Sequence, residues 1–400
     1  MIYKKNIYFD FFSLAPTGSG LSGSDRIFIE LARNWSVKNL VKIYTTQEGV
    51  EMCGRQGLSG KYLVINKIEK NQLPYNFFLK YLYKIYLGIK LGITLNIGHK
   101  SLITDHYIYS SSDFWMDVIP CVILKIRYPK LKWVATWYQT APNPFKGYSE
   151  GIREEKYNFS AFLYWFSQLP IKPLIRKYAD FVIVNNEEER KQFSKMNNLG
   201  KVIVLLGAVR LDDIENWKLK IGNILKIYDA VFMGRFHPQK GVVELIDIWR
   251  KVVDEIPNAK LAMIGDGPLM KKVKSQITNF KLHNNIKLFG YLFDGPEKYR
   301  IFAQSKIVVH PAFYDSGGMA SAEAMAFELP AIGFNLKAFD SYYSKGMIKV
   351  KGINEFADTI CEILKNNNKR KIFGKAAYNM IVESYTWESR GKEIYSYINK

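Results

Sequence analysis

Two carboxylates stand on either side of a Gly-Gly pair, and their types and spacing suit ligand chemistry. Phe313–Phe327 reads FYDSGGMASAEAMAF, which places Asp315 eight positions before Glu323. The residues after the glycines are strong helix formers, so a helix is expected to begin at Met319 or Ala320. Both acids would then belong to one strand–turn–helix unit.

The segments around this turn predict an anion site. An apolar run at Lys306–His310 precedes the turn, and Leu329–Gly333 restarts a strand after it. A strand, a glycine turn and a helix N-terminus direct backbone N–H groups towards one point, beside the positive end of a helix dipole. Glu323, expected in the first turn of the helix, would accept two hydrogen bonds from a vicinal diol. A bound anion beside a bound diol describes a nucleotide; the alternative is a plain turn at residues 315–318 with a solvated Glu323.

A second cluster supplies positive charge. Asp229–Phe232 is an expected strand, and it runs into MGRFHPQKG, which contains Arg235 and Lys240. Val242–Ile256 follows with apolar residues at a helical period. The two cations are therefore expected in a strand-to-helix loop at the carboxyl edge of a parallel sheet, where such folds bind ligands. A guanidinium and an ammonium at that edge suit a diphosphate.

A pair of glycines ends the next expected strand. Lys260–Ile264 is followed by Gly265, Asp266, Gly267 and Pro268. Glycines at this position would let the backbone approach a ligand, although a lone G-x-G is a weak signal.

Together these motifs resemble a known family. The ordered segments GRFHPQKG, LAMIGDGP, LFGYL and HPAFYDSGGMASAEAMAFELPAIGF are similar to the carboxy-terminal donor domain of retaining nucleotide-sugar glycosyltransferases of GT-B architecture. That family, the glycosyl transferases group 1, includes sucrose synthases, bacterial glycogen synthases and lipid mannosyltransferases. The resemblance covers roughly residues 225–385. It implies an α/β fold of two Rossmann-like domains that face each other across a cleft.

The resemblance also implies roles for individual residues. Arg235 and Lys240 would bind the donor diphosphate and stabilise it as leaving group, and Glu323 would bind the ribose hydroxyls. Asp315 occupies the position that faces the donor sugar and the reaction centre, so it joins the two cations as a catalytic candidate. The family has Glu at that position, and with one methylene fewer either the loop moves inward or the sugar contact changes. Further donor-binding candidates are Gly234, Gly317, Gly318, Met319, Ala320, Gly265, Gly267 and, in a loop after the first strand, Gly20.

The amino-terminal half also predicts alternating strands and helices. Strands are expected at Ile7–Phe12, Val41–Thr45, Tyr107–Ser110, Lys132–Thr136 and Phe181–Asn185, with a helix at Asp25–Trp35. Such alternation implies a parallel sheet. We expect residues 1–205 to form the acceptor-side domain and 206–386 the donor domain. A last helix within 387–400 is expected to pack back on the first domain, as in the resembling fold.

The charge of the chain limits its partners. With 57 Lys and Arg against 37 Asp and Glu, the net charge is +20. No nucleic-acid-binding signature accompanies this charge, so an anionic membrane surface is the preferred partner. Leu73–Leu95 and Asn158–Tyr178 interleave aromatic, aliphatic and basic residues, as interfacial helices do. The alternative is that both segments are core helices with lysines extended to solvent.

No metal or cofactor site is evident in the sequence. Cys53, Cys121 and Cys361 are unclustered, and no metal-binding spacing of His and acids occurs. Many members of the family carry a His that faces the sugar after a central strand of the amino domain. The corresponding loop here offers Tyr138 or Gln139, and His106 is a further possible sugar or acceptor contact. No secretion signal is recognised, so the chain is expected in the cytoplasm, peripheral on the inner face of the cell membrane.

These observations predict a hexosyltransferase. It would move a sugar from a UDP- or GDP-sugar to a glycan or lipid-linked acceptor, with retained anomeric configuration and without metal. Two alternatives stay open: a non-catalytic nucleotide-sugar-binding or scaffolding protein, and a nucleotide-sugar epimerase.

Overall fold

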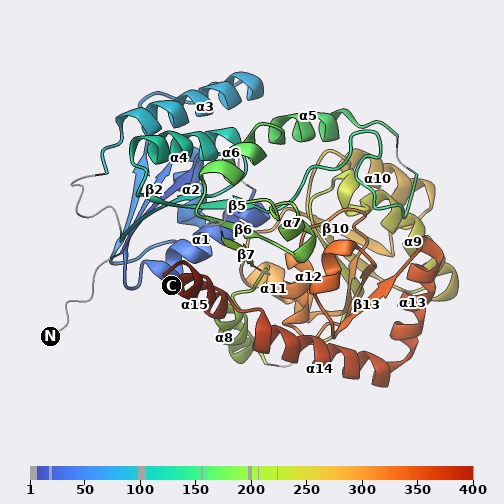
Figure 1. Ribbon diagram of the computed structural model, residues 1–400. Helices are drawn as coiled ribbons and strands as arrows, with labels where there is room; N and C mark the ends of the chain where they lie inside the picture. Colours follow the sequence, from blue (N-terminus) through green and yellow to red (C-terminus); the bar gives the residue numbers. More distant parts are fainter. Residues whose placement is uncertain are drawn as a thin grey trace. The chain divides into compact units, whose positions relative to one another are not determined.

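The chain divides into two compact units, shown in the computed structural model of Figure 1. The structure describes residues 7–17, 20–97, 105–154, 156–196, 201–205, 207–222 and 224–399. Unit 1 contains Met1–Ala141, Phe159–Leu205 and Arg390–Lys400, and unit 2 contains Pro142–Asn158 and Leu206–Ser389. The segment Pro142–Asn158 thus groups with unit 2, whereas the sequence analysis placed it in the amino-terminal domain.

Unit 1 is built on a seven-stranded parallel sheet in the order β3-β2-β1-β4-β5-β6-β7. The strands are β1 Tyr8–Ser13, β2 Leu40–Thr45, β3 Leu63–Lys67, β4 His106–Ser110, β5 Lys132–Trp137, β6 Phe181–Val184 and β7 Lys201–Val204. The helices are α1 Gly23–Trp35, α2 Gln47–Arg55, α3 Phe77–Thr94, α4 Trp115–Arg127, α5 Phe159–Gln168, α6 Ile171–Tyr178 and α7 Glu187–Lys191. Every strand expected in this half is present.

The last helix, α15 (Trp387–Ile398), crosses from unit 2 into unit 1. Trp35 at the end of α1 donates its indole N–H to the carbonyl of Gly391 at 3.1 Å. A Cβ at Gly391 would lie 2.8 Å from the Asn34 side chain, so this close approach requires glycine.

Unit 2 has a six-stranded parallel sheet in the order β10-β9-β8-β11-β12-β13. The strands are β8 Tyr228–Met233, β9 Leu261–Ile264, β10 Ile286–Gly290, β11 Ser305–His310, β12 Ala331–Phe334 and β13 Met347–Val350. The helices are α8 Leu211–Ile221, α9 Val242–Glu255, α10 Met270–Asn279, α11 Pro296–Ala303, α12 Met319–Met325, α13 Ile353–Lys365 and α14 Asn367–Ser384. Strand order reverses between β8 and β11, which makes the carboxyl ends of these two strands the topological switch point, the usual ligand site of such sheets.

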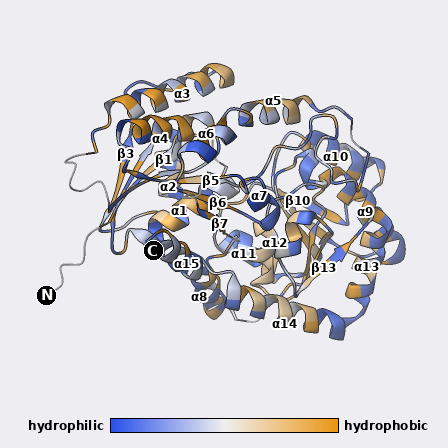
Figure 2. Cartoon of the chain, in the orientation of Figure 1, coloured by the Kyte–Doolittle hydropathy of each residue, from blue (hydrophilic) through white to orange (hydrophobic). Residues whose placement is uncertain are grey.

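The apolar pattern explains these elements. Strands buried on both faces read as continuous apolar runs, as β9 (LAMI) does. Figure 2 shows hydrophobic residues both in the strands and along helices such as α3. In α9, Val242, Leu245, Ile246, Trp249 and Val252 are buried at a helical period. The predicted helix at Val242–Ile256 is therefore confirmed, with its end one residue earlier.

The segment Leu73–Leu95 contains α3 (Phe77–Thr94), which packs against α4 (Figure 1). Two glycines allow this approach: a Cβ at Gly88 would lie 2.7 Å from the carbonyl oxygen of Met116, and one at Gly92 would lie 2.9 Å from Ile123. Within the described residues, no helix is both long and apolar enough to cross a membrane.

Candidate active site

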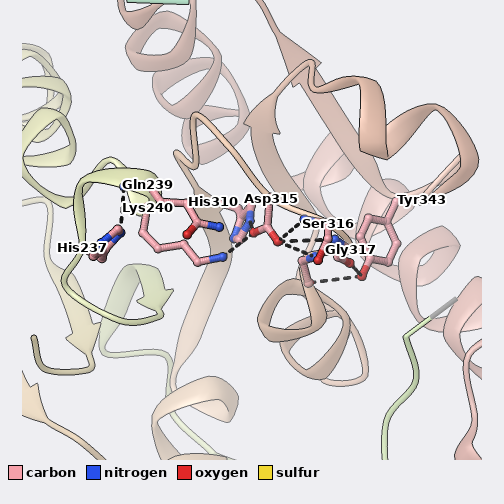
Figure 3. Close-up of polar contacts among 9 residues, drawn as sticks. His237, Gln239, Lys240, His310, Asp315, Ser316, Gly317 and Tyr343 are labelled. Carbon is pink, nitrogen blue, oxygen red and sulfur yellow. Dashed lines mark hydrogen bonds and ion pairs between the residues drawn. The ribbon is translucent and has the colours of Figure 1, made fainter. Parts of the chain in front are cut away.

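Two loops at the switch point of unit 2 bring the predicted cation and acid together. The first loop follows β8 and carries Lys240, and the second follows β11 and carries Asp315. The ammonium Nζ of Lys240 lies 2.5 Å from Oδ2 of Asp315 (Figure 3). The loops are also joined through their backbones, because the N–H of Phe313 donates to the carbonyl of Gln239 at 2.9 Å. Gly241 has φ +62°, and a Cβ there would lie 2.0 Å from the Pro311 carbonyl, so only glycine fits this junction.

Asp315 is held by five hydrogen-bond donors. Its Oδ2 accepts from Lys240 and from Nε2 of His310 at 2.7 Å. Its Oδ1 accepts from the backbone N–H groups of Ser316, Gly317 and Gly318 at 2.7, 3.3 and 3.4 Å. The side chain is 7% exposed. The amide cradle predicted at this turn therefore exists, but its anion is the chain's own carboxylate.

The electrostatics keep Asp315 ionised. Burial alone would raise the pKa of its carboxyl, but the Lys240 charge and the His310 hydrogen bond hold that pKa well below its ordinary value. The side chain of Lys240 remains 22% exposed. Among the described residues, no acceptor binds the amides of Met319 and Ala320 at the start of α12.

The turn itself is braced from behind. Gly318 has φ +55°, and the hydroxyl of Tyr343 donates to the carbonyls of Gly317 at 2.7 Å and Gly318 at 3.1 Å. Figure 3 shows this tyrosine against the turn, on the side away from Lys240. The helix begins at Met319, as the sequence predicts.

Glu323 lies deeper than expected. It is the fifth residue of α12, past the first turn, and its side chain is 6% exposed. Lys298 of α11 places its Nζ 2.5 Å from Oε2 of Glu323 and also pairs with Asp294. The alternative of a solvated Glu323 is therefore wrong. Sequence reasoning missed Lys298, because its contact with Glu323 joins two helices that are 25 positions apart at these residues.

Arg235 is exposed, and among the described residues its side chain has no hydrogen-bond or ion-pair partner. Its charge acts on the same loop: burial and the charges of Arg235 and Lys240 lower the pKa of His237 to about 4. His237 is therefore neutral near pH 7, and its Nδ1 accepts from the N–H of Gln239 at 3.3 Å. A loop whose field disfavours another positive charge favours an anionic ligand.

Arg153, from the segment Pro142–Asn158, supports both loops and was not anticipated from the sequence. Its guanidinium donates to the carbonyl of Pro238 at 2.8 Å, pairs with Glu244, and lies 4.1 Å from the centre of the Phe313 ring. Nothing in local spacing predicts this contact, because it joins residues 85 positions apart or more.

Gly265 and Gly267 allow the backbone after β9 to pack closely against the backbone of the loop after β8. Their φ values are +141° and +155°, and Cβ atoms would lie 1.9 Å from the Gly234 carbonyl oxygen and 2.6 Å from that of Phe236. The N–H of Phe236 donates to the carbonyl of Asp266 at 2.8 Å. These glycines, with Gly234, thus shape the loop that carries Arg235 and Lys240.

The remaining candidates lie in unit 1. Tyr138 is buried, with its hydroxyl 2.8 Å from that of Tyr109, so it is a core residue. The carbonyl of Gln139 accepts from the Tyr164 hydroxyl at 2.9 Å. His106 is buried at the start of β4, away from that strand's carboxyl end, and pairs with Asp10 at 2.8 Å.

Gly20 is exposed, and a Cβ there would have open space around it. The structure thus brings Lys240 and Asp315 together in unit 2 and gives Tyr138 and His106 structural contacts in unit 1. The described residues contain no group of three or more His, Cys, Asp or Glu side chains that could hold a metal ion.

Comparisons with known proteins agree with this fold. Residues 213–380 match the family model described as "Glycosyl transferases group 1". An uncharacterised glycosyltransferase of Methanocaldococcus jannaschii is 27% identical over 289 residues, covering 69% of this chain and 64% of that protein. The poly(ribitol-phosphate) alpha-N-acetylglucosaminyltransferase of Staphylococcus aureus is 29% identical over 51% of this chain and 44% of its own length. The matches thus span roughly half to two thirds of these relatives.

Solved structures extend the likeness to the whole chain. HepE of Anabaena, in complex with UDP and glucose, aligns with a TM-score of 0.70 and 14% identity, covering 99% of this chain and 100% of that one. Sucrose-phosphate synthase of Thermosynechococcus elongatus aligns with a TM-score of 0.72 at 14% identity over 98% of both chains. The predicted fold class is confirmed. Residues 213–380, which carry both loops and both acids, match the glycosyl transferases group 1 family, and the chain has the GT-B fold.

Proposed function

We propose that this chain is a glycosyltransferase that moves a sugar from a nucleoside diphosphate sugar to a glycan or lipid-linked acceptor. The observation that carries the proposal is the meeting of the Lys240 loop with the Asp315 turn at the switch point of unit 2. UDP or GDP would be the nucleotide of the donor. The structure of HepE, which has the same fold, is a complex with UDP and glucose, and this supports a donor of this class.

The diphosphate would bind to the two cations of the β8 loop. Arg235 is exposed and has no ion-pair partner among the described residues, and the side chain of Lys240 is partly exposed while it contacts Asp315. A diphosphate could therefore form a second ion pair with the ammonium of Lys240, or it could draw that ammonium away from the carboxylate of Asp315. Both cations would stabilise the charge that develops on the departing nucleotide, which is the largest protein contribution expected.

Asp315 would not be left uncompensated when Lys240 turns to the phosphate. His310 and three backbone amides still donate to its oxygens. Lys240 could therefore move from Asp315 to the donor phosphate at little electrostatic cost. Asp315 then acts on the reaction as a positioning residue, through Lys240 and through the shape of the turn that begins α12.

Glu323 would bind the ribose diol of the donor. Lys298 lies against the buried carboxylate of Glu323 and fixes its orientation. A carboxylate held in this way accepts hydrogen bonds from hydroxyls without the cost of ordering it first. The glycines Gly234, Gly317 and Gly318 and the amides of Met319 and Ala320 complete the proposed donor contacts.

Retained configuration and independence from metal belong to the same proposal. Arg235, Lys240 and the helix amides supply the positive charge that a divalent cation supplies in other nucleotide sites. The acceptor is proposed as a glycan or a lipid-linked saccharide. The S. aureus relative is named for a poly(ribitol-phosphate) acceptor, and a strongly basic chain also suits anionic acceptors of that kind.

The experiment is a nucleotide screen followed by a transfer assay. Titration calorimetry with UDP, GDP and ADP should show one preferred diphosphate, with binding weakened in Arg235→Ala and unchanged in the exposed control Lys271→Ala. Incubation of the matching donor sugars should release free nucleotide, faster with a competent acceptor, and the anomeric configuration of the product is read by proton NMR. The proposal fails if no nucleoside diphosphate binds.

One observation favours a second candidate. Both oxygens of Asp315 are engaged, which would also suit a nucleotide-sugar-binding protein without turnover. Binding of a donor with no release of nucleotide, with or without acceptors, would support this scaffolding function. Conversion of the donor sugar into its epimer would show up in the same NMR spectra.

A further inference from the structure

The helix α3 exposes an apolar stripe on the side turned away from the protein. Five apolar residues recur there at helical spacing. They are Phe78 (66% exposed), Leu82 (46%), Tyr86 (53%), Ile89 (38%) and Ile93 (58%). Tyr75, Phe77 and Leu79 extend the exposed apolar surface at the start of the helix. A run of this length on one face is not scattered surface hydrophobicity, and such patches mark interaction sites.

The opposite face of α3 packs against α4. Leu87, Gly88 and Gly92 are buried on α4, where the two glycines permit close helix packing. The helix is therefore apolar on two opposite sides, although only one side is covered. A helix that is apolar all round is normally buried on every side, so the outer stripe calls for a second apolar medium or partner.

The lysines of α3 divide between two functions, which corrects the sequence-based view of them as one basic face. Lys84 is 1% exposed; its Nζ lies 2.7 Å from Glu48 and 2.5 Å from the carbonyl oxygen of Pro16. Lys80 pairs with the same Glu48 at 2.8 Å. Both lysines hold the helix on unit 1. Lys90 is the exposed cation beside the stripe.

The charge around the stripe is one-sided. The helices α3, α4, α5 and α6 contain a single acid, Asp117, and it is fully buried and binds the backbone N–H of Leu14 at 2.6 Å. Their exposed charges are therefore all positive, including Lys90, Arg127 and Lys177. In α5, Phe159, Leu163, Trp165 and Phe166 add exposed apolar and aromatic groups. Aromatic and aliphatic residues rimmed by cations, with no exposed acid, complement an anionic lipid interface.

We propose that the outer face of α3 docks on an anionic lipid surface, with Phe78, Leu82, Tyr86, Ile89 and Ile93 inserted at the level of the headgroups. A second copy of the chain is a poorer occupant, because a two-fold contact would place the same unbalanced positive charges opposite each other. A soluble polyanion would satisfy the cations and leave the apolar stripe in water. The inference does not depend on the donor chemistry of unit 2.

The test uses the full chain and vesicles of phosphatidylglycerol and phosphatidylcholine in equal parts, with pure phosphatidylcholine as the neutral reference. The protein should co-sediment with the anionic vesicles at low salt. Phe78→Ser with Ile93→Ser should lower the partition coefficient by roughly tenfold or more. Lys90→Gln should lower it by about fivefold, and high salt should remove most of that difference.

Matched controls separate docking from folding. Leu219→Ser with Ile372→Ser removes two apolar side chains that are 84% and 65% exposed in unit 2, and Lys274→Gln removes an exposed lysine there. These controls should bind vesicles like the unaltered chain, and all variants should keep its thermal midpoint and nucleotide affinity. The proposal is overturned if the chain does not bind anionic vesicles, or if the α3 variants bind as well as the controls. It is also overturned if sedimentation velocity shows self-association that these variants abolish without any vesicle binding.

Discussion

The substitution Asp315→Asn tests how the two loops of unit 2 depend on each other. It preserves the size of the side chain but removes its charge. The carbonyl oxygen of the new amide can still accept from the backbone N–H groups of Ser316, Gly317 and Gly318. The amide nitrogen then faces the ammonium of Lys240 and Nε2 of His310, where a carboxylate oxygen accepted before.

The magnitude follows from this exchange. Breaking a buried ion pair by removing one partner costs about 3–5 kcal/mol. Lys240 is 22% exposed and can be hydrated in part, so a cost at or just below the lower limit of that range, about 2–3 kcal/mol of unfolding free energy, is expected. For a domain of this size, that corresponds to a fall of about 5–10 °C in the thermal midpoint of unit 2.

The expected effect on ligands has the opposite sign. Lys240 no longer has a carboxylate competing for it, so the affinity for free UDP or GDP should stay the same or rise. Transfer should fall, because the turn that begins α12 loses its charged anchor. Calorimetry with the preferred nucleotide and initial rates of transfer measure the two effects separately.

The pH dependence adds a second readout. The folded pKa of Asp315 lies below its ordinary value of 3.8, so its contribution to stability is fully present above that ordinary value and is lost as pH falls towards the folded pKa. The stability difference between Asp315→Asn and the unaltered chain should therefore hold from about pH 8 to pH 5 and shrink below about pH 4. Urea titrations at several pH values measure it.

The control is Asp254→Asn, which neutralises an exposed acid of α9. It should change neither stability nor nucleotide affinity. The reasoning is refuted if Asp315→Asn keeps normal stability while losing nucleotide affinity, because Asp315 would then bind the nucleotide directly instead of Lys240.

Three further predictions concern the donor site. Arg235→Ala and Lys240→Ala should each cost about 2–4 kcal/mol of transition-state stabilisation, measured as kcat/KM; near-normal turnover in either variant would contradict the diphosphate assignment. Glu323→Gln should weaken the binding of free nucleotide in calorimetry, since a neutral amide accepts more weakly from the ribose diol; an unchanged affinity would remove Glu323 from the ribose site. Transfer should persist in EDTA, and a loss that Mg²⁺ or Mn²⁺ restores would show that the cations of the chain do not suffice.

Much of the fold follows from local pattern in the sequence. The apolar period of Val242–Glu255 and the glycine turn before Met319 fix where helices begin, because these signals act over a few residues. The strands before Arg235 and Asp315 were also predictable as apolar runs. The adjacency of β8 and β11 in the sheet then brings the two loops together, but this strand order is known only from the structure.

The partners of the buried charges could not be inferred in the same way. Lys298, Arg153 and Lys84 each hold a site or a helix through contacts between segments distant in the chain. In sequence, a lysine that ends in a buried pair looks the same as one in solvent. The aromatic-basic segment at α3 shows the consequence: its period predicts an amphipathic helix, but only the structure separates the inward Lys84 from the outward Lys90.

The short side chain of Asp315 allows its carboxylate to bind both the amides of its own turn and the ammonium of Lys240. An aspartate carboxylate reaches the N–H groups two and three residues ahead, as in turns that aspartate commonly starts. The distances to Gly317 and Gly318, 3.3 and 3.4 Å, are already long. A glutamate would carry its carboxylate one methylene further from the backbone and could not keep these amides and Lys240 together. We infer that, in the proposed transferase, this aspartate fixes the turn but reaches less far towards the donor sugar than a glutamate, so other groups at the site would select the sugar.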